Sequence, residues 1–323
     1  MAAMPQPPLP SIVDLSRVSA ESIELLLNEE ISIWQQRFRW DFRSSADMLR
    51  RFVGARSLSG FGLQLGNELV GYTYHVFEGH KALIGDFYLR QDYVSPSSEL
   101  ILLNAIVQSL AMSSGIRRIE SQLMMLPQVP VSALPFSRFL SRYDRLFMEA
   151  SGSVASALQP ASTEFRVSFV PWREKHQEEI AHLVSAAYRG HVDSEINDQY
   201  RTIPGARQFL ANIIKFPGCG RFSPTASVVA IDDRTGRVCG VCLGSIIAPQ
   251  AGHVTQLCVL PAIRGARLGY ELLRQTMVRF AELGCATVSL TVTASNVDAI
   301  RLYESVGYRS RATFPALVWE GFR

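Results

Sequence analysis

The sequence predicts an α+β protein, of mixed α/β character, built from two domains that share one architecture. Its 323 residues exceed a typical single domain. Hydrophobic residues make up 47% of the chain and charged residues 19%, which is enough to bury a sizeable core. The same order of predicted elements also occurs twice. We therefore expect two diverged copies of one unit, each a mixed, mostly antiparallel sheet flanked by helices.

The first copy follows a short proline-rich tail over residues 1–10. Alternating or continuous apolar runs predict strands, apolar residues at helical spacing predict helices, and the pair Gly66-Asn67 predicts a hairpin turn. In chain order the elements are a helix over 45–55, strands over 60–67, 68–79 and 81–90, a helix over 97–115 and a strand over 116–126.

The second copy repeats this order. Its elements are a strand over 164–172, a helix over 174–190, strands over 226–233, 238–247 and 253–260, a helix over 268–284, a strand over 286–294 and a helix over 296–307. The segment 151–163 between the copies is small, polar and contains proline, which is typical of a linker. We therefore predict one domain over 11–155 and a second over 164–323.

The net charge and the lengths of the apolar runs argue against nucleic-acid-binding and membrane-spanning proteins. The net charge of +3 gives no sign of the clustered basic surface that a nucleic-acid-binding protein needs. No apolar run approaches the roughly 20 residues that span a bilayer, and the N-terminus lacks the basic and apolar regions of a signal peptide. We therefore expect a cytoplasmic protein that binds neither nucleic acid nor membrane.

The five cysteines are an odd number in apolar surroundings, as is typical of a reducing compartment. Cys239 and Cys242 form a C-x-x-C pair, which in other contexts binds metal. Here the pair lies in a predicted strand, where residues three apart point to opposite faces. We therefore expect no metal site.

An anion site is predicted where a strand ends near Pro261, a turn runs from Arg264 to Gly269, and a helix begins. The first amides of a helix have no internal partner and lie at the positive end of its dipole. Small residues in the turn would admit a diphosphate, although the glycines could instead only shape a tight loop. Arg267 stands where such a turn usually has its first glycine, so we expect its φ angle to be negative.

A second pattern lies downstream, where residues 296–308 read NVDAIRLYESVGY. Asn296 suits a helix N-cap, and Ala299, Ile300 and Tyr303 then share one helix face. A tyrosine at such a position is otherwise most often a core residue.

These two stretches, LCVLPAIRGARLG (257–269) and NVDAIRLYESVGY, resemble the GNAT superfamily of acetyl-CoA-dependent N-acetyltransferases. The phosphate loop of that family reads Q/R-x-x-G-x-G/A, and its second signature reads N-x-x-A-x-x-L/F-Y-x-x-x-G-F. The resemblance covers residues 164–323 and departs from the pattern at Arg267. It implies acetyl-CoA as the acyl donor and no metal.

The resemblance also implies roles for individual residues. The strand end Leu257, Cys258 and Val259 would bind the pantetheine arm through its backbone. The pyrophosphate would lie on the amides of Arg264, Gly265, Ala266, Arg267, Leu268, Gly269 and Tyr270. Asn296 would contact the cofactor near the thioester or the arm. Tyr303 would protonate the departing thiolate of CoA, which a phenol is chemically able to do.

The general base is less clear from the sequence. Many members of the family carry a glutamate on the strand before the loop, whereas this chain has His253, Thr255 and Gln256 there. We predict His253 as the base, acting directly or through water, with a purely structural histidine as the alternative. The region after the first helix covers the acceptor site in the family, so Glu195, Asn197 and Tyr200 are predicted to select the amine, unless this region is only a solvated loop.

The first copy lacks both signatures. Glu99 lies in the first turn of the helix at the matching junction, where a carboxylate would repel a diphosphate. In a loose alignment, Leu140 takes the place of Tyr303. The aromatic residues of this copy are predicted to be core: Trp34, Trp40, Phe42 and Tyr72. We therefore expect a degenerate copy without a cofactor site.

The favoured function is transfer of an acetyl group from acetyl-CoA to an amine by direct attack, in the second copy. The predicted acceptor is a small-molecule amine or the amine of a peptide or protein, and a homodimer stays open. The alternative is a catalytically inactive tandem protein that binds acyl-CoA or a partner protein.

Overall fold

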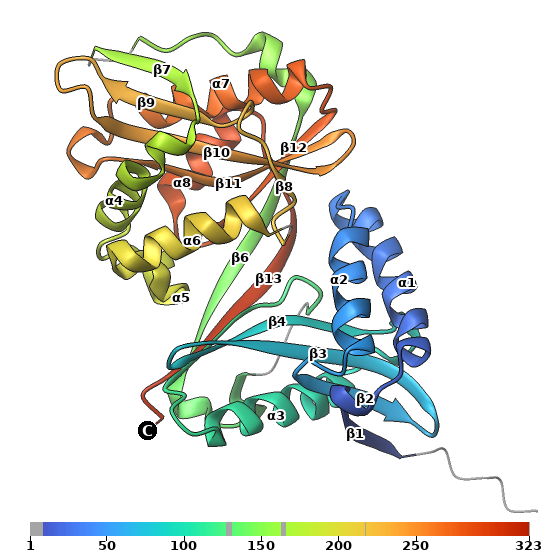
Figure 1. Ribbon diagram of the computed structural model, residues 1–323. Coiled ribbons are helices and arrows are strands. Elements are labelled where there is room, and N and C mark those ends of the chain that lie inside the picture. Colours follow the sequence, from blue (N-terminus) through green and yellow to red (C-terminus); the bar gives the residue numbers. More distant parts are fainter. Residues whose placement is uncertain (1–8, 127–130, 163–165, 217, 323) are drawn as a thin grey trace, which may run out of the picture. The chain divides into compact units, whose positions relative to one another are not determined.

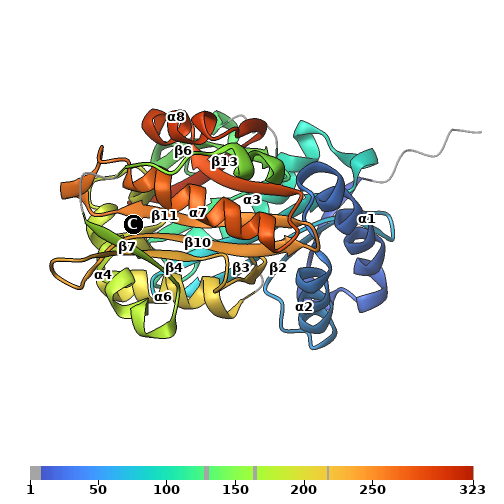
Figure 2. The ribbon, with the colours of Figure 1, turned by 90° about the horizontal axis from the view of Figure 1, so that it is seen from above.

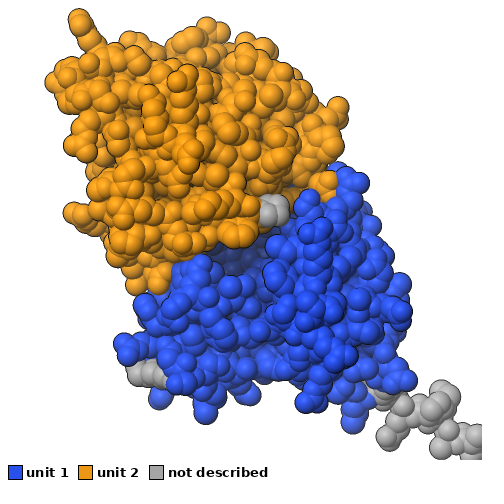
Figure 3. Space-filling view, in the orientation of Figure 1, with its two compact units in different colours: residues 1–38, 42–143, 314–323 blue, residues 39–41, 144–313 orange. Residues whose placement is uncertain are grey.

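The computed structural model (Figure 1) describes residues 9–126, 131–162, 166–216 and 218–322. Most of the predicted proline-rich tail, residues 1–8, lies outside this description. Contacts between residues divide the chain into two compact units, coloured separately in Figure 3. Unit 1 comprises residues 1–38, 42–143 and 314–323, and unit 2 comprises residues 39–41 and 144–313.

Unit 1 contains every helix and strand predicted for the first copy. Its elements are β1 (Pro10–Asp14), α1 (Ala20–Phe38), α2 (Arg43–Gly54), β2 (Gly60–Leu65), β3 (Glu68–Glu78), β4 (Lys81–Leu89), α3 (Pro96–Met112), β5 (Arg118–Gln122) and the last residues of β13 (Arg309–Glu320). Of these elements, β1, α1 and β13 were not predicted from the sequence. The four predicted core aromatics, which include Trp40 of unit 2, are all buried.

The sheet of unit 1 has the strand order β1-β2-β3-β4-β5-β13. All neighbours are antiparallel except β4 and β5, which are parallel and joined by α3. Figure 1 shows α3 on one side of this sheet and α1 and α2 on the other. The apolar face of α3 packs against the sheet through Leu102, Leu103 and Ile106, all fully buried.

Unit 2 contains every element predicted for the second copy. Its elements are β6 (Leu140–Ser151, from Asp144 onward), β7 (Val167–Pro171), α4 (Gln177–Ala187), α5 (Asp193–Ile196), α6 (Ile203–Lys215), β8 (Arg221–Phe222), β9 (Val228–Asp232), β10 (Val238–Ala248), β11 (Ala251–Val259), α7 (Leu268–Glu282), β12 (Thr287–Thr293) and α8 (Val297–Ser305). The strands β6 and β8, the short helix α5 and the longer α6 were not predicted.

The sheet of unit 2 has the order β6-β12-β11-β10-β9-β7, with β8 paired to β10. Here too a single neighbouring pair, β11 and β12, is parallel, and a helix, α7, joins the two strands. α7 packs into one core through Leu272, Leu273 and Phe280. α4 and α6 build a second core with residues of β9 and β10. The view in Figure 2 shows α7 lying along the strands of this sheet.

Each unit takes its last antiparallel strand from the other half of the sequence. In unit 2, β6 pairs with β12 from Arg145↔Thr293 to Ser151↔Thr287. In unit 1, β13 pairs with β5 through residues 316–320. The division of the chain therefore falls after Tyr143, and again before Phe314, and differs from the predicted domains 11–155 and 164–323 with their linker 151–163. Hydrogen-bond pairing between distant strands leaves no mark in local composition.

The two sheets share a further detail that supports the internal repeat. In β4, Gly85 is an extra residue opposite the step from Tyr74 to His75 of β3. In β11, Thr255 is an extra residue opposite the step from Leu243 to Gly244 of β10. In both units this bulge follows directly on the last paired residue of the parallel strands.

Two local predictions are wrong. Cys239 and Cys242 do not point to opposite faces, because β10 has an irregular register after Val238 and both thiols pack into the core beneath α7. Leu140 does not occupy a helix equivalent to α8, since it is the first residue of strand β6. All five cysteines are free.

Among the described residues, no helix has both the length and the hydrophobicity needed to cross a bilayer. In the same part of the chain, no three or more His, Cys, Asp or Glu side chains gather in a way that would hold a metal ion.

Candidate functional site

A cavity forms in unit 2 where the parallel strands β11 and β12 diverge. Their pairing runs from Ala251↔Thr287 to Val254↔Leu290 and ends at the bulge residue Thr255. Beyond this point a cavity of about 920 Å³ lies between the two strands, α7, α8 and the turn that follows α4. The bulge thus marks the point at which the two strands stop pairing, and the cavity begins there.

The end of β11 offers a free main-chain edge to this cavity. Leu257, Cys258 and Val259 pair with residues 240–242 of β10 on one side and line the cavity on the other. Because a strand carries hydrogen-bonding groups along both edges, this edge can pair with an extended ligand. Burial raises the pKa of the Cys258 thiol to about 12, so the thiol stays protonated at neutral pH.

The turn before α7 contains two residues with a left-handed backbone. A short 3-10 helix, Pro261–Ile263, leads into Gly265 with φ +85° and Arg267 with φ +60°. The expectation of a negative φ for Arg267 is therefore wrong. A left-handed arginine costs about 1–2 kcal/mol. It is held there as the N-cap of α7, where its carbonyl accepts the first helical hydrogen bond, from Glu271, at 3.1 Å.

The two arginines of the turn have different surroundings. The Arg264 guanidinium donates to the carbonyl of Ala187 at 2.5 Å and so ties the turn to the end of α4. The Arg267 guanidinium lies 5.7 Å from the ring centroid of Tyr270. The predicted turn residues that line the cavity are Arg264, Gly265, Arg267, Leu268, Gly269 and Tyr270, whereas Ala266 is buried and does not line it.

Helix α8 brings the second predicted motif to the same cavity. Asn296 is its N-cap, as predicted, and its Oδ1 accepts from the amide of Ala299 at 3.3 Å. Tyr303 lines the cavity with 8% of its surface exposed. Burial raises the pKa of Tyr303 above its usual value, so its hydroxyl carries a proton at neutral pH.

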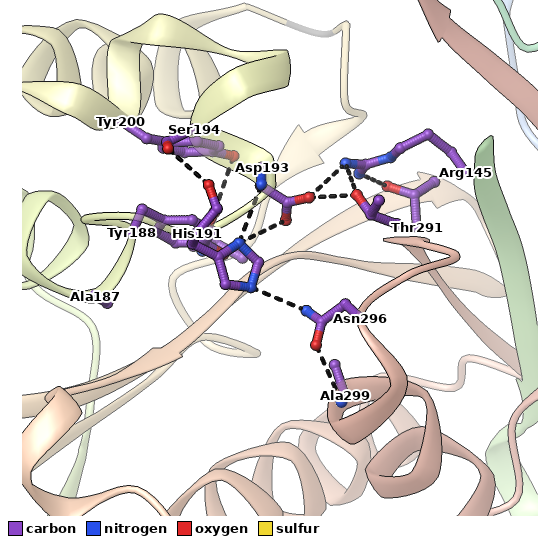
Figure 4. A network of polar contacts seen from close by, with 12 residues as sticks. Arg145, Ala187, Tyr188, His191, Asp193, Ser194, Tyr200, Thr291, Asn296 and Ala299 are labelled. Atoms are coloured by element: carbon purple, nitrogen blue, oxygen red, sulfur yellow. Dashed lines mark hydrogen bonds and ion pairs between the residues drawn. The ribbon is translucent and has the colours of Figure 1, made fainter. Parts of the chain in front are cut away.

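A polar network crosses the cavity from the turn after α4 to α8 (Figure 4). His191, in that turn, has its Nε2 atom 3.2 Å from Nδ2 of Asn296. Its Nδ1 atom accepts from the amide of Asp193 at 3.1 Å and lies 3.9 Å from the Asp193 carboxylate. The imidazole is therefore fixed between a backbone amide and an N-cap side chain.

The carboxylate of Asp193 is held in turn by the exchanged strand β6. Arg145 donates to Asp193 Oδ1 at 3.2 Å, and the hydroxyl of Thr293 donates to the same oxygen. Arg145 also contacts the hydroxyls of Thr293 and Thr291 at 3.1 and 3.2 Å. Because both charged side chains are largely buried, this ion pair is weakly screened and the carboxylate has a defined position.

Two stacked tyrosines lie beside this network. The rings of Tyr188 and Tyr200 are 4.3 Å apart, and Gln256 of β11 bonds to both hydroxyls. All three residues line the cavity. Of the predicted acceptor residues, the structure thus brings Tyr200 to the site.

Glu195 and Asn197 do not line the cavity. Glu195 is exposed and forms an ion pair with Arg201 at 2.9 Å. The side chain of Asn197 accepts from the amide of Gln199 at 3.0 Å and so caps a short 3-10 helix. Their predicted role in amine selection gains no support from these positions.

His253 is also absent from the cavity lining, and we correct its predicted role as general base. It is buried, with the ring of Trp40 at 5.0 Å and that of Phe147 at 6.4 Å, and its Nδ1 atom is 2.9 Å from the hydroxyl of Ser289. Burial lowers the pKa of His253 to about 3. A ring enclosed in this way belongs to the core of unit 2.

The residues at the centre of the polar network, His191, Asp193 and Arg145, were not predicted as site residues. His191 and Asp193 lie in the polar stretch 191–201 that was expected near the acceptor site, so a local signal existed, although it pointed to other residues. No sequence signal marked Arg145, because it enters the site on β6, a strand that was not predicted and that lies within the predicted first domain.

Comparisons with known proteins agree with this geometry. Residues 194–308 match the model of the acetyltransferase (GNAT) family. An uncharacterised N-acetyltransferase from Methanocaldococcus jannaschii is 36% identical over 87 residues, which are 27% of this chain and 55% of that protein. The chain thus matches about half the length of this curated relative.

Solved structures extend the likeness in fold to nearly the whole chain. A GCN5-related N-acetyltransferase from Sphaerobacter thermophilus has a TM-score of 0.64 at 15% identity, covering 99% of this chain and 98% of its own. A tandem GNAT protein from the clavulanic acid biosynthesis pathway has a TM-score of 0.63 at 14% identity, covering 97% and 98%. Residues 194–308 thus match the GNAT family, and nearly the whole chain shares the fold of this tandem GNAT protein.

Proposed function

We propose that this protein is an acetyl-CoA-dependent N-acyltransferase whose active site is the cavity of unit 2. The observation that carries the proposal is the divergence of β11 and β12 directly beside the N-terminus of α7. This arrangement provides a main-chain edge and an anion site in one cavity, and acetyl-CoA needs both.

The described residues fit the donor at its two ends. The free edge of Leu257 to Val259 would bind the amides of the pantetheine arm, as an added strand would. The amides of about residues 264–270 would hold the diphosphate at the positive end of α7. A Cβ at Gly265 would have no atom within 4 Å, so the glycine is explained by its left-handed backbone, and the space beside it is free for a phosphate.

Tyr303 is the proposed general acid. It lines the cavity from α8, and burial keeps its hydroxyl protonated. When the amine attacks the acyl carbon and the carbon–sulfur bond breaks, the thiolate of CoA needs a proton, which the phenol supplies. Asn296, at the start of the same helix, would position the donor near this hydroxyl.

The acceptor is proposed to be an amine, of a small molecule or of a peptide or protein. Tyr188, Tyr200 and Gln256 would form its side of the cavity, because they line it next to His191 and contact one another. Two stacked rings offer an apolar surface, and the glutamine and the two hydroxyls offer hydrogen bonds.

Calorimetry and a thiol-release assay test the proposal. Titration of the full chain with acetyl-CoA should give one site per chain, and the protein should release CoA faster when primary amines are present. Two sites would mean that unit 1 also binds the donor. Binding without release over an amine panel would favour a non-catalytic acyl-CoA-binding protein, and no binding would exclude the proposed function.

A further inference from the structure

We propose that Asp193 selects acceptors that carry a second positive charge, so that the substrate is a diamine or another amine with a further ammonium group. This inference rests on the proposed function, because it names the class of acceptor that the cavity of unit 2 takes. Asp193 is the first residue of α5, belongs to the polar network in Figure 4 and lines the cavity. Nothing in the two sequence motifs points to it.

The carboxylate of Asp193 has one occupied oxygen and one available oxygen. Oδ1 accepts from Arg145 at 3.2 Å and from the hydroxyl of Thr293. Oδ2 accepts no hydrogen bond from the residues that the structure describes, and 14% of the side-chain surface of Asp193 is exposed. An ionised oxygen on a cavity wall can bind a donor from the cavity, and a charged donor forms the strongest bond.

His191 does not supply this donor. The nitrogen that approaches Oδ2 is Nδ1, which lies 3.9 Å away and accepts from the amide of Asp193 at 3.1 Å. Nδ1 therefore carries no proton in the neutral ring, so Nδ1 and Oδ2 are both acceptors. Two acceptors side by side favour a ligand that brings protons to this place, as an ammonium group does.

The rings around Asp193 also suit a cation. The stacked rings of Tyr188 and Tyr200 line the same cavity, and the faces of aromatic rings attract positive charge. Burial raises the pKa of both tyrosines and of Tyr303, and the nearby charge of Asp193 adds to each rise. Asp193 thus acts electrostatically on the acceptor side of the cavity and on the proposed general acid.

The ion pair with Arg145 makes Asp193 an anchor for a charged group. Arg145 contacts Oδ1, so an ammonium at Oδ2 would lie closer to the carboxylate than to the guanidinium, and attraction would outweigh repulsion. A carboxylate paired in this way is also a poor proton acceptor. The group that it binds therefore stays charged throughout the reaction, and the nitrogen that attacks the acyl carbon is a different one.

The test compares diamines with monoamines of the same length. CoA release by the full chain is measured with propanediamine, butanediamine and hexanediamine, each with its amino groups at the two chain ends, and with the matching alkylamines. For at least one length we expect kcat/KM for the diamine, halved for its two equivalent ends, to exceed that for the alkylamine about 10- to 100-fold. No excess at any length would overturn the inference.

Asp193→Asn removes the charge and keeps the size of the side chain. We expect it to lower kcat/KM for the preferred diamine about 10- to 100-fold, mainly through KM, and to change that for the alkylamine much less. Because this substitution leaves Arg145 without its partner, the double variant Arg145→Gln/Asp193→Asn is measured as well and should lose the same preference. The ratio of two substrates in one sample does not depend on how much of the protein is folded.

Asp298→Asn is the matched control, because Asp298 is an exposed carboxylate of α8 that also lines the cavity. It should keep the preference for diamines. Equal losses with the diamine and the alkylamine in Asp193→Asn would overturn the role of Asp193 as an anchor and leave the transferase intact. If the wild type releases CoA with no amine of either kind, the proposed function itself fails.

Discussion

The Nε2 atom of His191 lies 3.2 Å from Nδ2 of Asn296, so the turn after α4 contacts the N-cap of α8. This single contact brings together a residue that sequence motifs do not mark and a residue that they do. It places His191 and the helix of the candidate acid, Tyr303, on one cavity. The chemistry of the site can therefore be tested by separate substitutions in the turn and in the helix.

Tyr303→Phe removes the proposed acid and keeps the ring. We expect kcat to fall about 100-fold, since the thiolate must then leave without a positioned proton donor, while calorimetry shows unchanged affinity for acetyl-CoA. CoA release at the wild-type rate would disprove the role of Tyr303.

The matched control is Tyr308→Phe, on a ring 5.9 Å from that of Tyr303. Among the described residues, the buried hydroxyl of Tyr308 has no hydrogen-bond partner. Its removal should leave kcat unchanged and should maintain or raise the melting temperature, because an unsatisfied buried hydroxyl costs about 1–3 kcal/mol.

Substitutions of Arg267 test whether the backbone of the proposed phosphate turn is left-handed at this position. Its φ of +60° suits glycine and strains any residue with a Cβ. We expect Arg267→Gly to be about 1 kcal/mol more stable to urea than Arg267→Ala, because both lack the charge and only the glycine relieves the strain. Equal stabilities would show that the residue is not left-handed in solution. The affinity of Arg267→Ala for acetyl-CoA, relative to wild type, then reports the contribution of the charge.

The burial of His253 leads us to expect that the free energy of unfolding falls at acid pH. Burial lowers the pKa of His253 to about 3, below the ordinary value near 6.5. Between these two pH values the ring is protonated in the unfolded chain and neutral in the native protein. The native state should lose about 1.4 kcal/mol per pH unit from this residue as the pH falls below about 6.5. His253→Gln should have a flatter profile of unfolding free energy between pH 6.5 and 4.5, with kcat near that of wild type.

The exposed His182→Gln should follow the wild-type profile in the same urea titrations. A wild-type slope equal to that of His253→Gln would show that the ring is accessible to protons in the native state. A loss of activity in His253→Gln without a loss of stability would restore His253 as a candidate base.

A buried carboxyl pair in unit 1 predicts the opposite pH dependence. Glu30 of α1 accepts from Trp34 and Tyr72, and burial together with the nearby Asp86 raises its pKa well above the usual value. Burial also raises the pKa of Asp86 to about 6. Because both pKa values are raised, the two carboxyls make their full contribution to the free energy of unfolding below about pH 4, where they are protonated. This contribution is lost as the pH rises through about 6 and the buried groups become charged.

Glu30→Gln should therefore gain stability relative to wild type as the pH rises from 5 to 8, because one buried charge is removed. Urea unfolding at several pH values measures this difference. Glu21→Gln, an exposed carboxyl on the same helix, should show no such trend. A difference between Glu30→Gln and wild type that is constant with pH would show that the two carboxyls do not share this environment.

Much of the donor side of the site could be predicted from the sequence, because its signals are local. The strand that ends at Val259, the glycine turn and the N-cap Asn296 each depend on neighbours within a few residues. The sign of φ at Arg267 could not be predicted in this way, since the preference of a single residue is weaker than the requirement of the helix start that follows it.

The acceptor side depended on contacts between distant residues. Arg145 reaches Asp193 because β6 pairs with β12, a pairing between segments more than 130 residues apart in sequence numbering. The sequence does not distinguish His253 from His191 as a site residue. The structure does, because the ring of His253 is buried in the core and the ring of His191 lines the cavity.

Local sequence patterns thus predict the α+β class, the two copies, most helices and strands, and the residues proposed to bind the donor. The exchange of the last strands, and the choice of the histidine that lies at the site, depend on tertiary contacts. Helix periodicity, caps and turns arise from interactions within a few residues, which a pattern records directly. Strand partners and burial arise from contacts across the whole chain, which no local pattern contains.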